Sequence, residues 1–235
     1  MDDYFKEYVE YNSYRMEDFT FADSLGDSLE YAKNTNTSMI PYNMPEEIIK
    51  LSDYNKIAEI YNNEQYTLNS DEYMIISYYY SLITIRNIAL ENNQELTIFG
   101  HKLKPKYNEC KDGFIEMASN HINSGVIIVP DEIVDEQYLA FNSIIGNYYT
   151  DSIDEQREIK EQILDLMKNP LSEEYCLPTV NSRVDISEAS IGLGALVTFL
   201  GLYLGIVFLI ASIAILALKE LTESTDNKER YKMLR

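Results

Sequence analysis

The sequence predicts an α+β extracellular domain followed by one long transmembrane α-helix with a cytoplasmic helical extension. Two observations support this fold class. Residues 189–218 contain no charged side chain, and residues 1–188 mix strand-like and helix-like patterns without strict alternation. We therefore expect an outer domain at 1–188, a membrane span at 189–218 and a helical tail at 219–235.

The uncharged segment is long enough to cross a bilayer as a helix. At about 1.5 Å per residue, its 30 residues reach about 45 Å, more than the roughly 30 Å hydrocarbon layer. Seventeen of them are Leu, Ile, Val or Phe, which favours insertion by about 5 to 10 kcal/mol. The alternative is a buried helix of a soluble protein, but the remaining chain offers too few helices to surround it.

Basic residues around the span predict its orientation. Before the span, Arg183 is the only nearby cation, whereas five follow it: Lys219, Lys228, Arg230, Lys232 and Arg235. Because basic loops stay in the cytoplasm, the C-terminus is expected inside the cell and residues 1–188 outside.

The outer domain is strongly acidic. Residues 1–188 hold 35 of the 39 acidic residues and 14 of the 19 basic ones, a net charge of −21. Such a surface repels DNA and RNA, so no nucleic-acid partner is expected. It suits a cationic peptide or divalent cations, or it simply keeps an extracellular surface hydrated.

Helical spacing marks three stretches of the outer domain. In the first, a short helix through Ile57 and Tyr61 follows the run Leu51-Ser-Asp-Tyr-Asn55, with Ser52 or Asp53 able to cap its start and two asparagines after it. A second short helix is expected around 114–122. In the third, Ile159, Ile163 and Leu166 repeat at helical spacing before Pro170.

Strand-like patterns separate these helices. Residues 72–82 are rich in β-branched and aromatic side chains, which predicts one buried strand. Residues 95–106 alternate on either side of Gly100 and predict a hairpin, and residues 125–129 predict a short apolar strand. A last strand is expected at 179–186, while residues 1–45 indicate only strand or loop.

Two charged groups and two cysteines are further candidates for sites. The basic residues within 101–111 could bind phosphate or balance nearby carboxylates. The four carboxylates within 131–136 could bind calcium or begin a solvated helix, although they lack the glycine turn and final glutamate of an EF-hand loop. Cys110 and Cys176 could form a disulfide or remain two thiols; without a CxxC motif, a metal site is not expected.

No motif for catalysis is present in the sequence. It contains no GxSxG, GxxxxGK[ST] or HExxH motif and only two histidines. We therefore expect no enzymatic activity and no cofactor in this chain.

Small residues are spaced so that they share one face of the predicted span. They are Gly194, Thr198, Gly201, Gly205 and Ser212. Such a stripe lets another helix approach closely in a membrane. The alternative is the ordinary glycine content of a membrane helix.

The span and its tail resemble a known family. The glycine-rich span followed by Leu218-Lys-Glu-Leu-Thr-Glu223 and by Asp226-Asn-Lys-Glu-Arg-Tyr-Lys-Met-Leu-Arg235 is similar to FtsX-like ABC transporter permeases, and most similar to their bacitracin-export branch. In that branch a helix of this kind follows a large extracellular domain. The similarity is specific over residues 191–235.

The resemblance implies a bacterial cell-membrane permease with about ten spans, in which this chain holds the loop before the eighth span and that span itself. We expect the chain to be a fragment, also because acidic residues rather than an export signal follow Met1. The implied partners are the other helices of the permease, a cytoplasmic ATPase that hydrolyses ATP, a sensor histidine kinase, and a cationic peptide or cell-wall lipid precursor. The residues expected near the ATPase are Asp226, Glu229, Arg230, Tyr231, Leu234 and Arg235.

Two other functions remain open. One is a single-pass membrane receptor or interaction protein with an acidic ectodomain. The other is a permease of the same superfamily that serves lipoprotein release or the control of cell-wall hydrolases.

Overall fold

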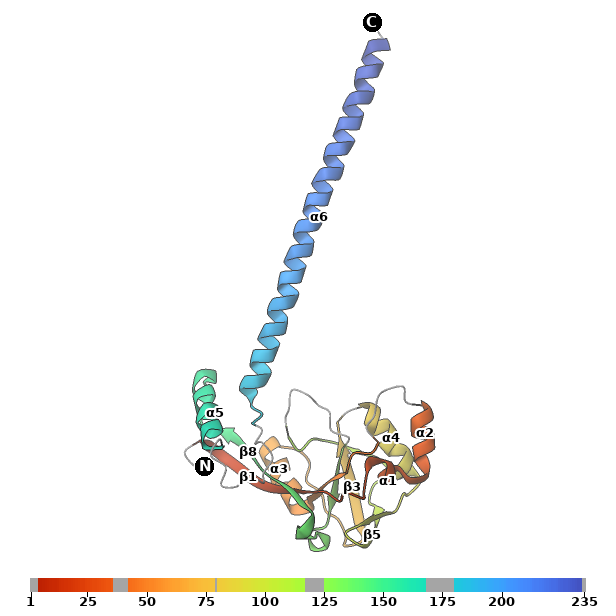
Figure 1. Ribbon diagram of the computed structural model, residues 1–235, viewed down its shortest axis with the longest axis vertical. Helices are drawn as coiled ribbons and strands as arrows, with labels where there is room; N and C mark the ends of the chain where they lie inside the picture. Colours follow the sequence, from red (N-terminus) through yellow and green to blue (C-terminus); the bar gives the residue numbers. More distant parts are fainter. Residues whose placement is uncertain (1–3, 36–41, 79, 117–124, 168–179, 234–235) are drawn as a thin grey trace. The chain divides into compact units, whose positions relative to one another are not determined.

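The computed structural model describes residues 4–35, 42–78, 80–116, 125–167 and 180–233. The chain divides into two units, Met1–Ser182 and Arg183–Arg235 (Figure 1). The first unit is a mixed sheet with helices, and the second is one long helix. The predicted α+β domain followed by a long apolar helix is therefore confirmed at this level of detail.

The first unit contains eight strands, five helices and three 3₁₀ turns within its described residues. In chain order they are β1 (Phe5–Tyr14), α1 (Phe21–Leu25), η1 (Gly26–Ser28), α2 (Leu29–Thr35), β2 (Glu47–Lys50), α3 (Leu51–Tyr61), β3 (Glu72–Ser77), α4 (Tyr80–Glu91), β4 (Leu96–Ile98), β5 (His101–Pro105), β6 (Lys111–Asp112), β7 (Val126–Val129), η2 (Asp131–Ile133), η3 (Glu136–Tyr138), β8 (Leu139–Tyr148) and α5 (Ile153–Met167).

The strands form one mixed sheet. Its order is β4-β5-β3-β7-β2-β1-β8, with β6 also paired to β3. The pairs β2–β7, β3–β5 and β3–β6 are parallel, and the others are antiparallel. The strand predicted at 125–129 is β7, and the hairpin predicted at 95–106 is β4–β5, which turns through Phe99 and Gly100 at positive φ.

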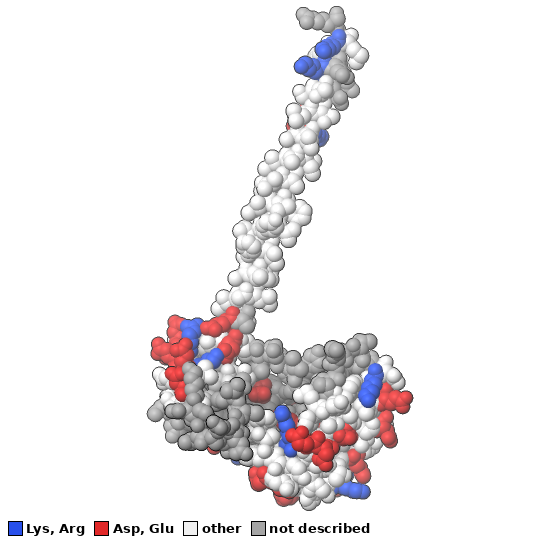
Figure 2. Space-filling view, viewed as in Figure 1, with Lys and Arg blue, Asp and Glu red and all other residues white. Residues whose placement is uncertain are grey.

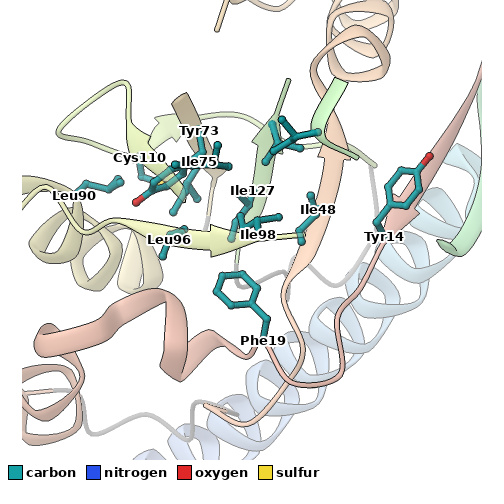
Figure 3. Packing of buried hydrophobic residues seen from close by; sticks show 13 residues of the cluster. Tyr14, Phe19, Ile48, Tyr73, Ile75, Leu90, Leu96, Ile98, Cys110 and Ile127 are labelled. Atoms are coloured by element: carbon teal, nitrogen blue, oxygen red, sulfur yellow. The ribbon is translucent and has the colours of Figure 1, made fainter. Parts of the chain in front are cut away.

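Apolar clusters cover both faces of the central strands, because neighbouring residues of a strand point to opposite faces. Ile48 of β2 and Ile127 of β7 belong to one cluster, whose packing Figure 3 shows. The next residues along the chain, Ile49 and Ile128, belong to the other cluster, together with Ile57 of α3. Central strands buried on both faces explain the continuous apolar runs in the sequence.

The predicted strand at 72–82 is only half correct. β3 ends at Ser77, and α4 begins at Tyr80. Leu82, Ile85 and Ala89 of α4 lie at helical spacing and pack in one cluster with residues of α1 and α2. The spacing of the apolar residues changes here from the strand period of two to the helical period. The run of aromatic residues at 78–80 fits both periods, so the sequence pattern did not indicate the boundary.

Other elements differ from the sequence expectations. Residues 1–45 contain the helices α1 and α2 besides a strand, and the ten-residue strand β8 was not predicted. The strand expected at 179–186 is wrong, because α6 (Arg183–Met233) already begins within it. The helix expected around 114–122 falls mostly outside the described residues, and 114–116 are not helical.

Helix α3 was predicted correctly, but its cap was not. Lys50 is the N-cap and makes no side-chain cap bond. The backbone N–H of Ser52 instead donates to Oδ1 of Asp131 at 3.0 Å, so a residue distant in sequence satisfies the first turn. The helix ends as expected, at Asn62 in the left-handed conformation.

Candidate functional site

The long helix α6 carries the candidate site for contact with other membrane helices. It runs without a break over 51 residues. The stretch Arg183–Thr225 is long and apolar enough to cross a membrane, and none of its most apolar window is buried within the chain. Figure 2 shows this stretch free of Lys, Arg, Asp and Glu over most of its length.

The predicted small residues do share one face of α6. Since each residue turns the helix by about 100°, the five side chains fall within an arc of about 60°. They are Gly194, Thr198, Gly201, Gly205 and Ser212. A β-carbon built on any of the three glycines meets no other atom within 4 Å, so nothing described in this chain requires glycine there.

The Thr198 hydroxyl on this face is satisfied inside the helix. The hydroxyl of Thr198 donates to the carbonyl oxygen of Gly194 at 2.8 Å. Outside the stripe, Ser190 makes the same bond to Ile186 at 2.8 Å. A face of small side chains, with the Thr198 hydroxyl bonded inside the helix, is suited to close approach by a second helix in lipid.

The tail predicted to lie near an ATPase continues the same helix. Asp226, Glu229, Arg230 and Tyr231 belong to α6 by their backbone, and the Tyr231 side chain is exposed. Leu234 and Arg235 lie outside the described residues. The tail and the span are therefore one helix, which would transmit a displacement along its axis.

The basic residues within 101–111 are largely paired with carboxylates. Lys104 contacts Asp71 at 2.7 Å, Lys106 contacts Glu72 at 3.2 Å, and Lys111 contacts Glu109 at 2.8 Å. The hydrogen bond that Lys104 donates to Asp71 raises the pKa of Lys104. Of the two readings of this segment, the charge-balancing one is supported by these pairs.

The four carboxylates within 131–136 do not form a cation site. Glu136 contacts Lys50 at 2.6 Å, and Asp135 accepts a bond from the backbone N–H of Gln137. The bond from Lys50 lowers the pKa of Glu136. Within the described ranges, no group of three or more His, Cys, Asp or Glu side chains could hold a metal ion.

The predicted cysteine pair lies partly outside the described structure. Cys110 is buried in the cluster of Figure 3, and its backbone N–H donates to Oδ1 of Asn87 at 2.7 Å. Burial raises the pKa of its thiol to about 12. Cys176 lies outside the described residues, so the disulfide stays a prediction.

Sequence reasoning missed two features of the first unit. One is a buried ion pair between Arg86 and Glu46, whose residues stand 40 positions apart. The other is the free edge of β8. Ten uncharged residues with apolar side chains at Leu139, Phe141 and Ile144 were the available signal for that strand.

No family model and no curated protein sequence matches the chain.

Proposed function

We propose that this chain is part of the membrane permease subunit of an ABC transporter of the FtsX-like family, in the branch that protects bacteria from bacitracin-type peptides. The observation that carries the proposal is the continuity of α6. One helix contains the apolar span, the uncovered stripe of small residues and the tail that resembles this family.

The orientation follows from the charges at the two ends of the span. The basic tail stays in the cytoplasm, and the acidic first unit lies outside. The stripe at Gly194, Gly201 and Gly205 packs against other helices of the permease. Residues 226–235 lie near a cytoplasmic ATPase, which hydrolyses the ATP.

The outer unit detects or releases the peptide. Its net charge of −21 over residues 1–188 attracts cationic peptides, alone or bound to a cell-wall lipid precursor. Movement of the ATPase reaches the outer unit through α6 acting as a rigid rod. A sensor histidine kinase is a further partner.

The test makes α6 more flexible at one point without changing its length. Residues 187–189 (Ser-Glu-Ala) are replaced by three glycines in one strain and by three alanines in a control strain. Each glycine weakens a helix by about 1 kcal/mol relative to alanine. We expect the glycine strain to become sensitive to bacitracin-type peptides while ATP turnover continues, and the alanine strain to stay resistant. Equal resistance of both strains would refute the rod, and unchanged resistance after deletion of the gene would refute the permease function.

A single-pass receptor is the second candidate, favoured by the one candidate span that follows a folded unit in the described structure. An antibody against the outer unit distinguishes the two on a blot of native membranes. A band near 27.2 kDa supports the receptor, and a much larger polypeptide supports the permease.

A further inference from the structure

The strand β8 forms one end of the sheet. It pairs with β1 from Leu139 to Tyr148, and its other edge has no strand partner among the described residues. A ten-residue edge offers a row of backbone N–H and C=O groups to another strand.

This edge lacks the usual protection against pairing. The strand, LAFNSIIGNY, contains neither a charged residue nor a proline. The side chains of Leu139, Phe141 and Ile144 are 42%, 37% and 41% exposed. The edge at the opposite end differs, because β4 has only three residues and its neighbour β5 carries a histidine and two lysines.

The strand is held firmly in place by β1. Asn142 donates to Oδ1 of Asn12 at 2.6 Å, and Asn147 donates to Oε1 of Glu7 at 2.8 Å. The ring of Phe5 stacks on Tyr148 with 5.4 Å between centroids. An edge that is already ordered loses little conformational entropy when another strand binds it.

We propose that β8 is the contact through which two copies of this chain associate, each β8 pairing antiparallel with the β8 of the second copy. A two-fold axis brings the same strand against itself in the antiparallel direction. A charged strand would then face its own like charges, but β8 has none. A cationic peptide, in contrast, finds no carboxylate on β8. The assembly closes at two copies, because each copy uses β8, the one long edge without a strand partner in the described part of the sheet.

The dependence on salt distinguishes association through β8 from ionic binding of a peptide. Two outer units, each near −21, repel one another, and salt screens the repulsion. Association through β8 therefore strengthens as salt rises, whereas binding of a cationic peptide weakens.

The test is the mass of the full chain in detergent, measured by sedimentation equilibrium at about 0.05 M and about 0.5 M NaCl. The variant Ile144→Lys places like charges at the proposed contact. It should fold, because position 144 faces Glu10 on β1 and a lysine there meets an opposite charge. Leu166→Lys on α5 is the matched control at another exposed apolar residue. The variant Gly201→Leu tests whether the copies associate through α6 instead.

We expect a dimer whose association is stronger at high salt, weakened at least about tenfold by Ile144→Lys. Leu166→Lys and Gly201→Leu should leave it unchanged. A monomer at both salt concentrations, an open series of larger assemblies, or a dimer that persists in Ile144→Lys would overturn the proposal. Peptide resistance is measured separately, so failure here leaves the proposed transport function intact.

Discussion

The guanidinium of Arg86 in α4 forms a bidentate ion pair with the carboxylate of Glu46 inside the first unit. Nη1 lies 2.7 Å from Oε1 and Nη2 lies 2.8 Å from Oε2, and both side chains are buried. Nη1 also donates to the hydroxyl of Ser24 at 3.0 Å, and the guanidinium lies 4.4 Å from the centre of the Phe21 ring. The pair therefore joins α4 and the residue before β2 to α1.

Removal of one partner should destabilise the first unit strongly. Arg86→Met leaves the Glu46 carboxylate buried without its cation, and we expect a loss of about 3 to 5 kcal/mol in the free energy of unfolding. The double variant with Glu46→Leu should recover part of it. The measurement is urea unfolding of the full chain, followed by near-ultraviolet circular dichroism. Lys104→Met at an exposed pair is the control, and an equal loss there would contradict the burial argument.

Gly146 is required by the close approach of β1. A β-carbon there would lie 2.9 Å from the backbone oxygen of Glu7 and from atoms of Phe5 and Tyr8. Gly146→Ala should therefore cost about 1 to 3 kcal/mol in the same unfolding experiment. Gly113→Ala is the matched control, because its β-carbon would make only ordinary contacts at 3.7 Å or more. Similar losses of unfolding free energy in both variants would show that position 146 has room for a β-carbon.

The stripe on α6 should tolerate no large side chain if other helices pack on it. Gly201→Leu and Gly205→Leu are expected to lower resistance to a bacitracin-type peptide to the level of cells without the gene. Ala214→Leu, on the opposite side of α6, should keep full resistance. The inhibitory peptide concentration is compared at equal membrane levels of each variant. Full resistance in both glycine variants would exclude this face as a packing surface.

Glu72 should make stability depend on pH. Its carboxylate accepts bonds from the backbone N–H and the side-chain amide of Asn69, at 2.9 and 3.0 Å, and contacts Lys106. These bonds, the backbone one foremost, lower the pKa of Glu72 below its usual 4.5. The stabilisation is thus present above pH 4.5 and is lost as pH falls through the lowered pKa. Glu72→Gln should lower the free energy of unfolding by about 1 kcal/mol at pH 7 and leave it unchanged at a pH below the lowered pKa. The measurement is urea unfolding of both proteins at a series of pH values. A pH-independent difference would contradict this.

The acidic first unit should bind a cationic peptide in a salt-dependent manner. Titration calorimetry of the full chain in an uncharged detergent should give heat with a lysine-rich linear peptide at low salt, and the affinity should fall as salt is added. An acidic peptide of equal length is the control. Absence of heat at low salt would remove direct peptide binding.

The local elements that sequence predicted best have a strong period and a clear end. Helix α3 combines an apolar face with Asn62 after it, and β7 is a short apolar run that ends at Pro130. The prediction failed where the period changed inside an aromatic run, at the boundary between β3 and α4. It also failed for β8, where both faces are partly exposed and the alternation of apolar residues is weak.

The sequence by itself determined the apolar part of α6, residues 189–218, because thirty consecutive uncharged residues are long and apolar enough to form a helix that crosses a membrane. Only the tertiary structure decided which residues of the first unit meet. Arg86 and Glu46 are 40 residues apart, and β1 and β8 are separated by most of the first unit. Local spacing carries no information about such pairs, since they depend on how the whole sheet brings distant strands and helices together.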